Sequence, residues 1–324
     1  MIKFILNRNM SRSIILLSLY CVSTLVVAQT TNPGKVQVVT KLVQKSISAQ
    51  PNQNLQIDAK RAKVILSPST DNQIHLKLSL IAKHTQREKA EKDLQALTYE
   101  ISTQGQDIVI KNQIDRNKIN ERITSLLKTI YEIQLPTQIP ITVKQNYGEV
   151  QIDKIKSPFT LQCDYTEIKL TQAQSEKAEI RTNYSDVTLK GCSGKFNISS
   201  NYGKIEINQS ENMDLTGNFN YGEISIQDFS GEINLNANHS EIEITGIKDA
   251  QKVNIVSNYT DIEFKNAQSL SDYGFDIAGH FSDIEIAEPL KKDFVRSSNK
   301  LFKNASKNAP VIRITVNHGD IEVE

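Results

Sequence analysis

The chain has 324 residues, and its 38 Lys and Arg residues against 37 Asp and Glu residues give a formal net charge of +1. The sequence contains no phosphate loop, nucleotide fingerprint or nucleic-acid-binding pattern. Its three cysteines also lack the spacing of zinc ligands. We therefore expect no cofactor and no nucleic-acid partner.

Residues 1–28 have the pattern of a secretory signal peptide. Three basic residues lie between positions 3 and 12, and an apolar segment too short to span a bilayer comfortably ends at Val27. Ala28 fits a cleavage site, so we expect the mature chain to begin near Gln29. No later stretch is long and apolar enough for a membrane helix. The sequence thus predicts a periplasmic, cell-surface or extracellular protein without a transmembrane segment.

Charge is distributed unevenly along the predicted mature chain, whose net charge is −2. Residues 30–145 hold 17 Lys and Arg against 10 Asp and Glu, whereas residues 146–324 hold 18 against 27. This polarity either orients the molecule toward a partner or decorates a solvated surface. Cys163 and Cys192 lie at different positions of their repeats, so they are either bridged through favourable loop geometry or two free thiols.

Residues 29–145 are predicted to form a β-rich cap with one short helix. Apolar residues alternate over residues 73–82, which is typical of a strand. Thr85 and Glu88 have capping-box spacing, which predicts a helix over about residues 86–97. Residues 55–66 match the later repeat, with Lys60, Arg61 and Ala62 in place of its turn residues, and are interpreted as a degenerate first coil. A solenoid needs such a cover over its open end.

A seven-residue motif, exemplified by Asn-Tyr-Gly-Glu-Ile-Ser-Ile at residues 220–226, recurs through residues 146–324. The copies begin at Asn146, Asp164, Asn183, Asn201, Asn220, Asn238, Asn258, His280 and Asn317. The first seven steps are 18–22 residues, and the last is about two units long. A fixed period of this length is typical of a solenoid.

Each repeat consists of a strand, a bend at the motif, a second strand and a loop, because apolar residues alternate on both sides of the bend. The sequence therefore predicts an all-β, single-domain β-solenoid or β-helix with about 18–19 residues and two strands per coil. Stacking in register would align identical residues. The Asn side chains would bond along the stack, and Asn tolerates the left-handed backbone that a bend often needs. The predicted structural ladders comprise Asn146, Asn183, Asn201, Asn220, Asn238 and Asn258, and Tyr147, Tyr165, Tyr184, Tyr202, Tyr221, Tyr259 and Phe281, with His239 and His318 as substitutes for tyrosine.

A basic insertion at residues 287–310 separates the last two copies of the motif. It is either a binding arm for an acidic partner or a cover for the C-terminal end of the stack. We favour the cover, because a solenoid requires one.

The segment Tyr131-Glu-Ile-Gln-Leu-Pro136, followed by Ile139-Pro-Ile141 and the run of Asn-Tyr-Gly-Glu-Ile-like units, resembles the secreted bacterial β-strand-repeat family whose members carry the name adhesin. These proteins are related to the head GIN-domain proteins. The resemblance covers residues 131–324 and implies a β-solenoid fold at the cell surface or in the periplasm. It carries no catalytic motif.

An acidic column is the one feature of the repeat that could carry chemistry. It comprises Glu149, Glu167, Asp186, Glu223, Glu241, Asp261, Asp283 and Asp320, interrupted by Lys204. Stacked carboxylates repel one another, so bound cations are physically reasonable, and Glu223, Glu241, Asp261 and Asp283 are the candidates. However, one carboxylate per coil is few ligands, and the Gly-Asp pattern of calcium β-rolls is absent. We predict a solvated acidic edge without a metal.

The acids follow the repeat, and no catalytic residue is predicted. His239, Ser240 and Glu241 have the residue types of a triad, but triads converge from separate segments. We predict a non-enzymatic, adhesin-like binding or scaffold module of the cell envelope, whose partner is an envelope polymer, a glycan or a protein. Its predicted ligand face includes the outward residues Glu206, Ser225, Glu243, Glu263 and Glu285. A carbohydrate-active β-helix enzyme, either a polysaccharide lyase or a hydrolase, is the alternative, and a self-assembling envelope filament is a third hypothesis.

Overall fold

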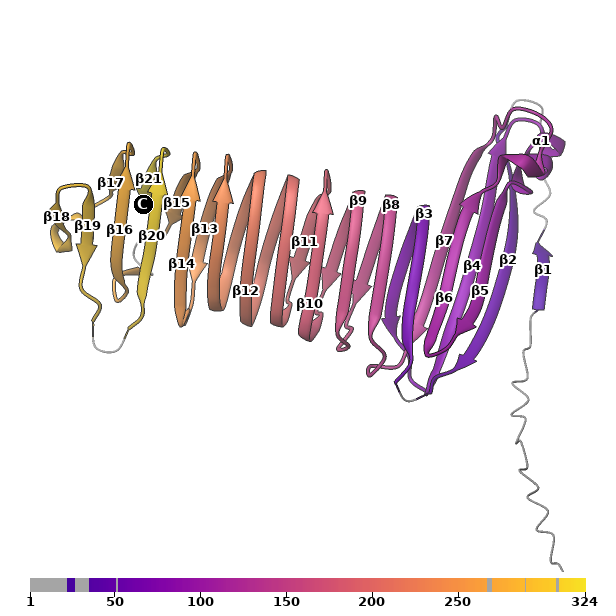
Figure 1. The fold of residues 1–324 in the computed structure, drawn as a ribbon, viewed down its shortest axis with the longest axis horizontal. Coiled ribbons are helices and arrows are strands. Elements are labelled where there is room, and N and C mark those ends of the chain that lie inside the picture. The colour runs from indigo at the N-terminus through magenta and orange to yellow at the C-terminus, as the bar shows by residue number, and fades with distance from the viewer. Residues whose placement is uncertain (1–21, 27–34, 51, 267–269, 289, 307–308) are drawn as a thin grey trace, which may run out of the picture.

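The computed structural model describes residues 22–26, 35–50, 52–266, 270–288, 290–306 and 309–324. It confirms an all-β repeat fold, in which strands lie side by side along one long stack (Figure 1). The predicted signal peptide lies outside the described residues, apart from the strand β1 at Val22–Val26. In the described part of the chain, no helix has the length and apolar character needed to cross a membrane.

The elements fall into three groups along the chain. The N-terminal group comprises β1 (Val22–Val26), β2 (Gln37–Ser48), β3 (Asn54–Pro68), β4 (Gln73–His84), α1 (Arg87–Leu94), β5 (Leu97–Gln104), β6 (Asp107–Ile114), the 3-10 helix η1 (Arg116–Lys118) and β7 (Leu126–Leu135). The regular stack comprises β8 (Ile141–Asp153), β9 (Phe159–Thr171), β10 (Gln174–Asn183), β11 (Val187–Lys190), β12 (Ser193–Asn238), β13 (Glu241–Ile247), β14 (Lys252–Asn258) and β15 (Asp261–Lys265). The C-terminal group comprises β16 (Gly274–His280), β17 (Ile284–Ile286), η3 (Leu290–Asp293), β18 (Val295–Ser297), β19 (Lys300–Lys303), β20 (Val311–Asn317) and β21 (Ile321–Val323).

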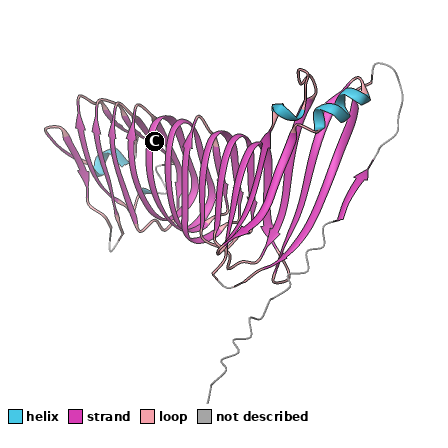
Figure 2. Cartoon of the chain, turned by 45° about the vertical axis from the view of Figure 1, so that its right-hand side comes forward, coloured by secondary structure: helices cyan, strands magenta, loops and turns pink. Residues whose placement is uncertain are grey.

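Successive coils of the stack pair in parallel and in register, so that equivalent residues lie above one another. Ile141 pairs with Phe159, for example, and Val150 pairs with Ile168. Each coil bends at its motif and contributes one strand to each of two facing sheets (Figure 2). The β-solenoid-like arrangement thus follows from one repeated frame.

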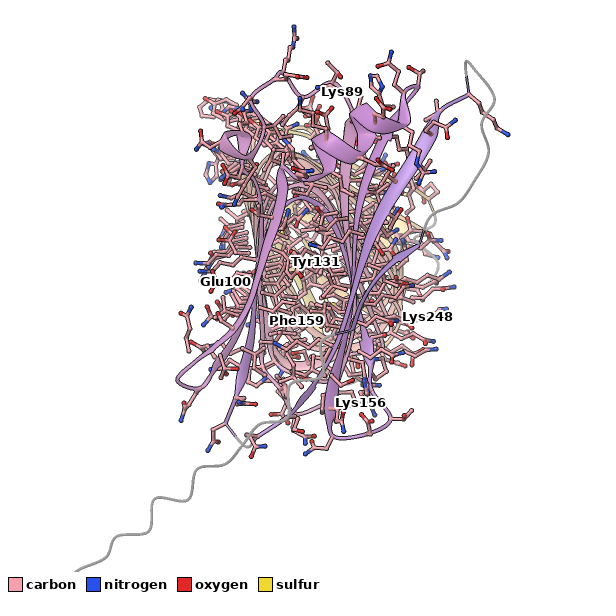
Figure 3. All side chains as sticks on the ribbon, turned by 90° about the vertical axis from the view of Figure 1, so that its right-hand side faces the viewer. Lys89, Glu100, Tyr131, Lys156, Phe159 and Lys248 are labelled. Atoms are coloured by element: carbon pink, nitrogen blue, oxygen red, sulfur yellow. The ribbon has the colours of Figure 1, made fainter. Side chains whose placement is uncertain are left out.

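The core lies between the two sheets, because period-2 alternation turns every second side chain inward. Phe159, Leu161 and Cys163 are buried along β9. Tyr131 and Phe159 lie in the middle of the end-on view, and charged residues such as Lys89 and Lys248 lie at its periphery (Figure 3). Each fully buried Ile, Leu, Val or Phe contributes roughly 1.5–3 kcal/mol.

One coil has no side chain at one of its inward positions. Its inward position holds Gly217, where the adjacent coils hold Ile198 and Leu235. A Cβ atom at Gly217 would lie 2.3 Å from Cε2 of Phe219 and 2.8 Å from Cδ2 of Leu235. The buried Phe219 ring therefore fills the space that this glycine leaves.

The N-terminal end of the stack begins with β3, which pairs in parallel with β8 over residues 55–66 and 141–152. This pairing confirms the predicted degenerate first coil. The other edge of β3 pairs with β6 and β7, which continue into antiparallel strands β5, β4 and β2. Helix α1 packs against β2 and β4. Both sheets thus end in antiparallel strands that cover this end of the core.

The predicted capping box of α1 is wrong. The N-cap residue is Gln86, and no side chain caps the helix. The helix begins one residue later than the motif requires, and the Gln86 N–H donates to the His84 ring at 3.0 Å. Thr85 and Glu88 therefore do not have the N-cap and N3 positions that a capping box needs.

The C-terminal end of the stack does not follow the order of the sequence. Strands β20 and β21 form a coil that lies between the coil of β14 and β15 and the coil of β16 and β17, with parallel pairing on both sides. Figure 1 shows β20 and β21 between these neighbours. The segment that connects the two coils forms β18 and β19, and β19 pairs antiparallel with β16. This pairing covers the strand edge at the end of one sheet.

Candidate functional site along the aromatic corner

Nine aromatic residues form one continuous ladder on the corner that follows the first strand of each coil. Neighbouring ring centroids are 4.8–5.0 Å apart, and the ring planes differ by 0–9°. In spatial order the aromatic ladder comprises Tyr147, Tyr165, Tyr184, Tyr202, Tyr221, His239, Tyr259, His318 and Phe281. The spacing of the coils therefore equals the spacing of stacked rings.

Every residue of this ladder has a left-handed backbone, with φ between 50° and 60°. The Asn before each ring tolerates this conformation but does not adopt it. A left-handed backbone costs a bulky residue about 1–2 kcal/mol, and each stacked pair returns about 0.5–1.5 kcal/mol. The bend is therefore stabilised by the neighbouring coils rather than by the local preference of one residue.

The residue after each ring faces the backbone of the neighbouring coil. A Cβ atom at Gly148 would lie 2.0 Å from the Ala62 carbonyl oxygen, and its φ is 147°. Three of the hydroxyls at this position accept a bond from the neighbouring coil: Ser185 from the Thr166 N–H at 3.0 Å, Ser240 from the Gly222 N–H at 3.3 Å and Thr260 from the Ser240 N–H at 3.3 Å. The small residues of the motif thus permit the close approach of successive corners.

The Asn residues before the rings form a second row of contacts. The Nδ2 group of one side chain donates to Oδ1 of the adjacent coil at 2.8–3.2 Å. These bonds join Asn183 to Asn201, Asn201 to Asn220, Asn238 to Asn258 and Asn258 to Asn317. Asn183 also donates to Asp164, the Asp that begins the second copy of the motif.

The acidic column runs beside the aromatic ladder and changes character along its length. At the N-terminal end Lys63 lies 3.0 Å from Glu149. The Lys63 and Gln151 side chains hold the pKa of Glu149 below its usual value against burial, which alone would raise it. Lys204, which interrupts the column, pairs with Glu206 on the adjacent outward column at 2.9 Å. Lys63 therefore neutralises the first carboxylate of the column, and Lys204 takes the place of a carboxylate within it.

The second half of the acidic column contains the candidate metal residues. Asp320 lies between Asp261 and Asp283, because its coil is inserted there. Oδ1 of Asp261 accepts from the Asp320 N–H at 2.9 Å, and Oδ1 of Asp320 accepts from the Asp283 N–H at 3.1 Å. These carboxylates thus act as hydrogen-bond acceptors between coils. Glu223 and Glu241 pair directly in register at the start of this half.

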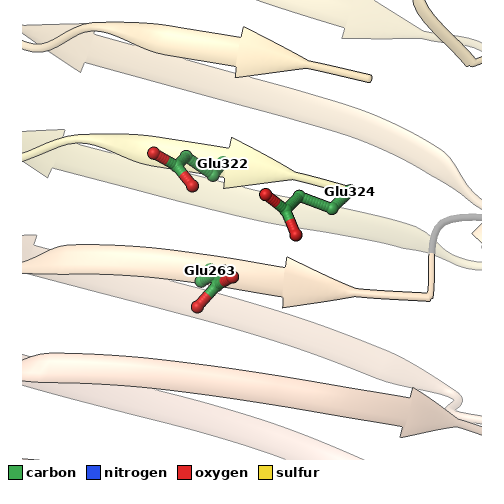
Figure 4. Close-up of side chains that lie close together, drawn as sticks. All are labelled: Glu263, Glu322 and Glu324. Carbon is green, nitrogen blue, oxygen red and sulfur yellow. The ribbon is translucent and has the colours of Figure 1, made fainter. Parts of the chain in front are cut away.

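Three further carboxylates meet on the outward face of the second sheet. The side chains of Glu263, Glu322 and Glu324 each place one oxygen within 4.8 Å of the others (Figure 4). Glu322 pairs with Glu263 on one side and with Glu285 on the other. Lys265 lies 3.0 Å from Glu263 and 2.8 Å from Glu243. The predicted ligand face is therefore strongly acidic at its C-terminal end.

A shallow groove of about 660 Å³ joins the aromatic ladder to the acidic column in the middle of the stack. Its lining includes the rings of Tyr221 and His239 and the carboxylates of Glu223, Glu241 and Asp261. The exposed fraction of each ladder tyrosine is 44–52%. Ring edges and carboxylates thus present a regular, solvent-accessible surface along several coils.

The triad-like residues do not form a triad. The His239 ring stacks between Tyr221 and Tyr259, and the Ser240 hydroxyl donates to the Asn238 carbonyl oxygen at 3.0 Å. Cys163 and Cys192 are free and buried. Burial raises the pKa of the Cys163 thiol to about 12 and that of Cys192 to about 11. Both thiols are therefore core side chains rather than nucleophiles.

A cleft at the C-terminal end of the ladder has no counterpart in the sequence interpretation. Residues 296–300 fold back onto the corner at Phe281. The repeat pattern could not predict this contact, because residues 296–300 belong to the basic insertion and not to a repeat.

Comparison with known proteins matches most of the chain to one family. The family model described as Toastrack DUF4097 matches residues 52–324. A solved structure of a "putative adhesin" from Bacteroides fragilis has 15% identity and a TM-score of 0.29, with 88% of this chain and 97% of that chain covered. A "putative cell adhesion protein" from Clostridium sporogenes has 12% identity and a TM-score of 0.26, with 89% and 99% covered. No curated protein sequence matches the chain.

Proposed function

The chain belongs to the Toastrack family, and we propose that it acts as an exported, non-enzymatic, adhesin-like binding or scaffold module of the cell envelope. In this proposal the stack is a single β-solenoid, with an N-terminal cap over residues 29–145 and repeats over residues 146–324. The signal-peptide pattern at residues 1–28 supports export.

The observation that carries the proposal is the continuity of the exposed corner. Stacked rings repeat at the coil spacing along the whole aromatic ladder, with half-exposed tyrosines, and carboxylates accompany them in every coil except that of Lys204. A rigid surface with one repeated spacing suits an extended polymeric or multivalent partner, because each coil adds the same contacts. The outward column of Glu206, Ser225, Glu243, Glu263 and Glu285 extends this surface onto the adjacent face of the stack.

Two measurements on the full chain test the proposal. Expression in a bacterial host, followed by fractionation and intact mass measurement, should give an exported product that begins at Gln29. Sedimentation of that product with isolated bacterial envelopes should show saturable binding without release of oligosaccharide. Retention of residues 1–28 in the cytoplasm would contradict export, and released oligosaccharide would favour the β-helix enzyme.

A matched pair of variants locates the binding face. Glu243→Gln with Glu263→Gln should reduce envelope binding several-fold, because these residues lie on the proposed ligand face. Asn234→Ala with Asn254→Ala alters outward residues of the opposite sheet at the same height of the stack. It should leave binding unchanged. Equal effects of the two pairs would contradict the assigned face.

A further inference from the structure

The two ends of the aromatic ladder are unlike. At the N-terminal end the Arg61 guanidinium carbon lies 5.4 Å from the centroid of the Tyr147 ring and covers its outer face. At the other end Phe281 stacks on His318 through one face, at 4.9 Å, and 83% of the residue is exposed. Within the described residues, no ring stacks on the second face of Phe281. The ladder thus ends in an open, apolar ring face.

This ring lies at a cleft of about 470 Å³ between the last corner of the stack and the turn that joins β18 to β19. The turn is held against the corner by several contacts. The Gly279 N–H donates to the Asn299 carbonyl oxygen at 3.0 Å, and Asn299 Nδ2 lies 3.1 Å from the His280 ring. Arg296 Nη2 donates to the Ile284 carbonyl oxygen at 3.2 Å. The two walls of the cleft are therefore fixed relative to each other.

The polar lining of the cleft contains both donors and acceptors. It is formed by Ser282, Asp283, Arg296, Ser298, Asn299, Lys300 and Asp320, beside Phe281. Within the described part of the chain, the Asp283 carboxylate and the Lys300 ammonium group have no hydrogen-bond or ion-pair partner, and both are exposed. Two acidic and two basic side chains balance each other, so the cleft selects for hydrogen-bonding capacity rather than for net charge.

These features match the chemistry of a sugar ring. A pyranose presents a face of C–H groups, which are attracted to the negative face of an aromatic ring. Its equatorial hydroxyl groups both donate and accept, and they require mixed partners such as carboxylate, amide, guanidinium and ammonium groups. A strongly anionic or cationic ligand would instead require a lining with one sign of charge.

We propose that this cleft binds one pyranose unit of a glycan, with Phe281 as the stacking platform and Asp283, Arg296, Asn299 and Lys300 as hydrogen-bonding groups. This inference rests on the proposed binding function and names its ligand class. The ladder supports the platform, because His318 and the rings behind it fix the orientation of Phe281.

The test uses the full chain and a panel of soluble hexasaccharides built from glucose, mannose, N-acetylglucosamine or galacturonic acid. Saturation-transfer NMR identifies binders, and calorimetric titration gives their Kd. We expect at least one sugar to bind, with Phe281→Ala raising the Kd roughly tenfold or more, since 1.4 kcal/mol corresponds to a factor of ten. Phe281→Trp should retain binding.

Two further variants distinguish the loss of contacts in the cleft from a general disturbance of this end of the stack. Asp283→Asn should raise the Kd several-fold without loss of the folded state. Phe302→Ala removes another partly exposed aromatic residue at the same end of the stack but outside the cleft, and it should leave the Kd unchanged. Binding that Phe281→Ala does not weaken, or the absence of binding to every sugar, would overturn the inference. Envelope binding in a parallel assay would then show that the broader proposal survives.

Discussion

The two ends of the stack are closed in different ways. At the N-terminal end, β3 pairs in parallel with β6 and β7, and long antiparallel strands beyond these two extend both sheets past the repeat. At the C-terminal end, a repeat coil returns into the stack, and only the short strands β18 and β19 lie outside it. The N-terminal end is therefore closed by strands that lie outside the repeat, whereas the C-terminal end is closed mainly by a coil of the repeat.

Among the variants that test this comparison, removal of residues 311–324 should cause the largest loss of stability. The deletion removes five buried residues, Ile312, Ile314, Val316, Ile321 and Val323, and leaves two coils without a common neighbour. At roughly 1.5–3 kcal/mol for each side chain, we expect a fall in Tm of about 20 °C or more by calorimetry. Arg313→Ala, an exposed change in the same coil, should leave Tm nearly unchanged. A deletion that costs only a few degrees would show that the inserted coil does not close the end.

Asp93→Asn tests the N-terminal end and should cause an intermediate loss of stability. Asp93 is buried, and its Oδ2 accepts from the N–H groups of Thr124 and Ser125 at 3.0 and 2.9 Å. Burial alone would raise the pKa of Asp93, but these bonds and Lys89 lower it to about 2. The ionised group therefore contributes stability above about pH 4, and this contribution is lost as the pH falls toward 2.

In urea unfolding at pH 7, we expect Asp93→Asn to cost about 2 kcal/mol. The difference from the wild type should shrink at pH 3. Glu91→Gln, on the exposed side of the same helix and paired with Arg87, should change stability by less than about 0.5 kcal/mol. A cost for Asp93→Asn that is the same at both pH values would mean that its charge is not the source of the stability.

The ladder variants should cost no more stability than Asp93→Asn, and they distinguish the middle of the ladder from its end. Tyr202 stacks on both sides, at 4.8 and 4.9 Å, whereas Phe281 stacks on one. At about 0.5–1.5 kcal/mol per pair, Tyr202→Ala should cost about 2 kcal/mol and Phe281→Ala about 1 kcal/mol in urea unfolding. Both residues have the same left-handed backbone, so its strain cancels in the comparison. Equal losses would contradict a stabilising role for the stacked rings.

The all-β repeat could be predicted from the sequence because its information is local. Alternation and the Asn-Tyr-Gly frame set both strands of a coil, and Lys60, Arg61 and Ala62 occupy the same frame in β3. At each corner the aromatic residue, and not the Asn before it, has the left-handed backbone. The propensities of a single coil do not indicate this, because stacking between coils stabilises it. Gly217 stands at an inward position where adjacent coils have large apolar side chains, and only the packing of Phe219 explains it.

The C-terminal arrangement could not be predicted, because it depends on contacts between distant segments. Asp320 lies between Asp261 and Asp283 only after its coil enters the stack. The cleft beside Phe281 likewise requires Arg296 and Asn299 to pack back onto the corner. A repeat pattern specifies which residues stack, but it does not specify the order of the coils.

The returning coil sets a constraint on the time order of folding. Residues 274–286 are synthesised before residues 311–323, yet their coil can dock only after the later coil has paired with β14 and β15. Coils up to residue 265 can form as the chain emerges, because each pairs with an earlier neighbour. The last two coils can form only after residues 311–323 have been synthesised. During synthesis, the molecule therefore carries an open stack edge and an undocked segment until residues 311–323 arrive.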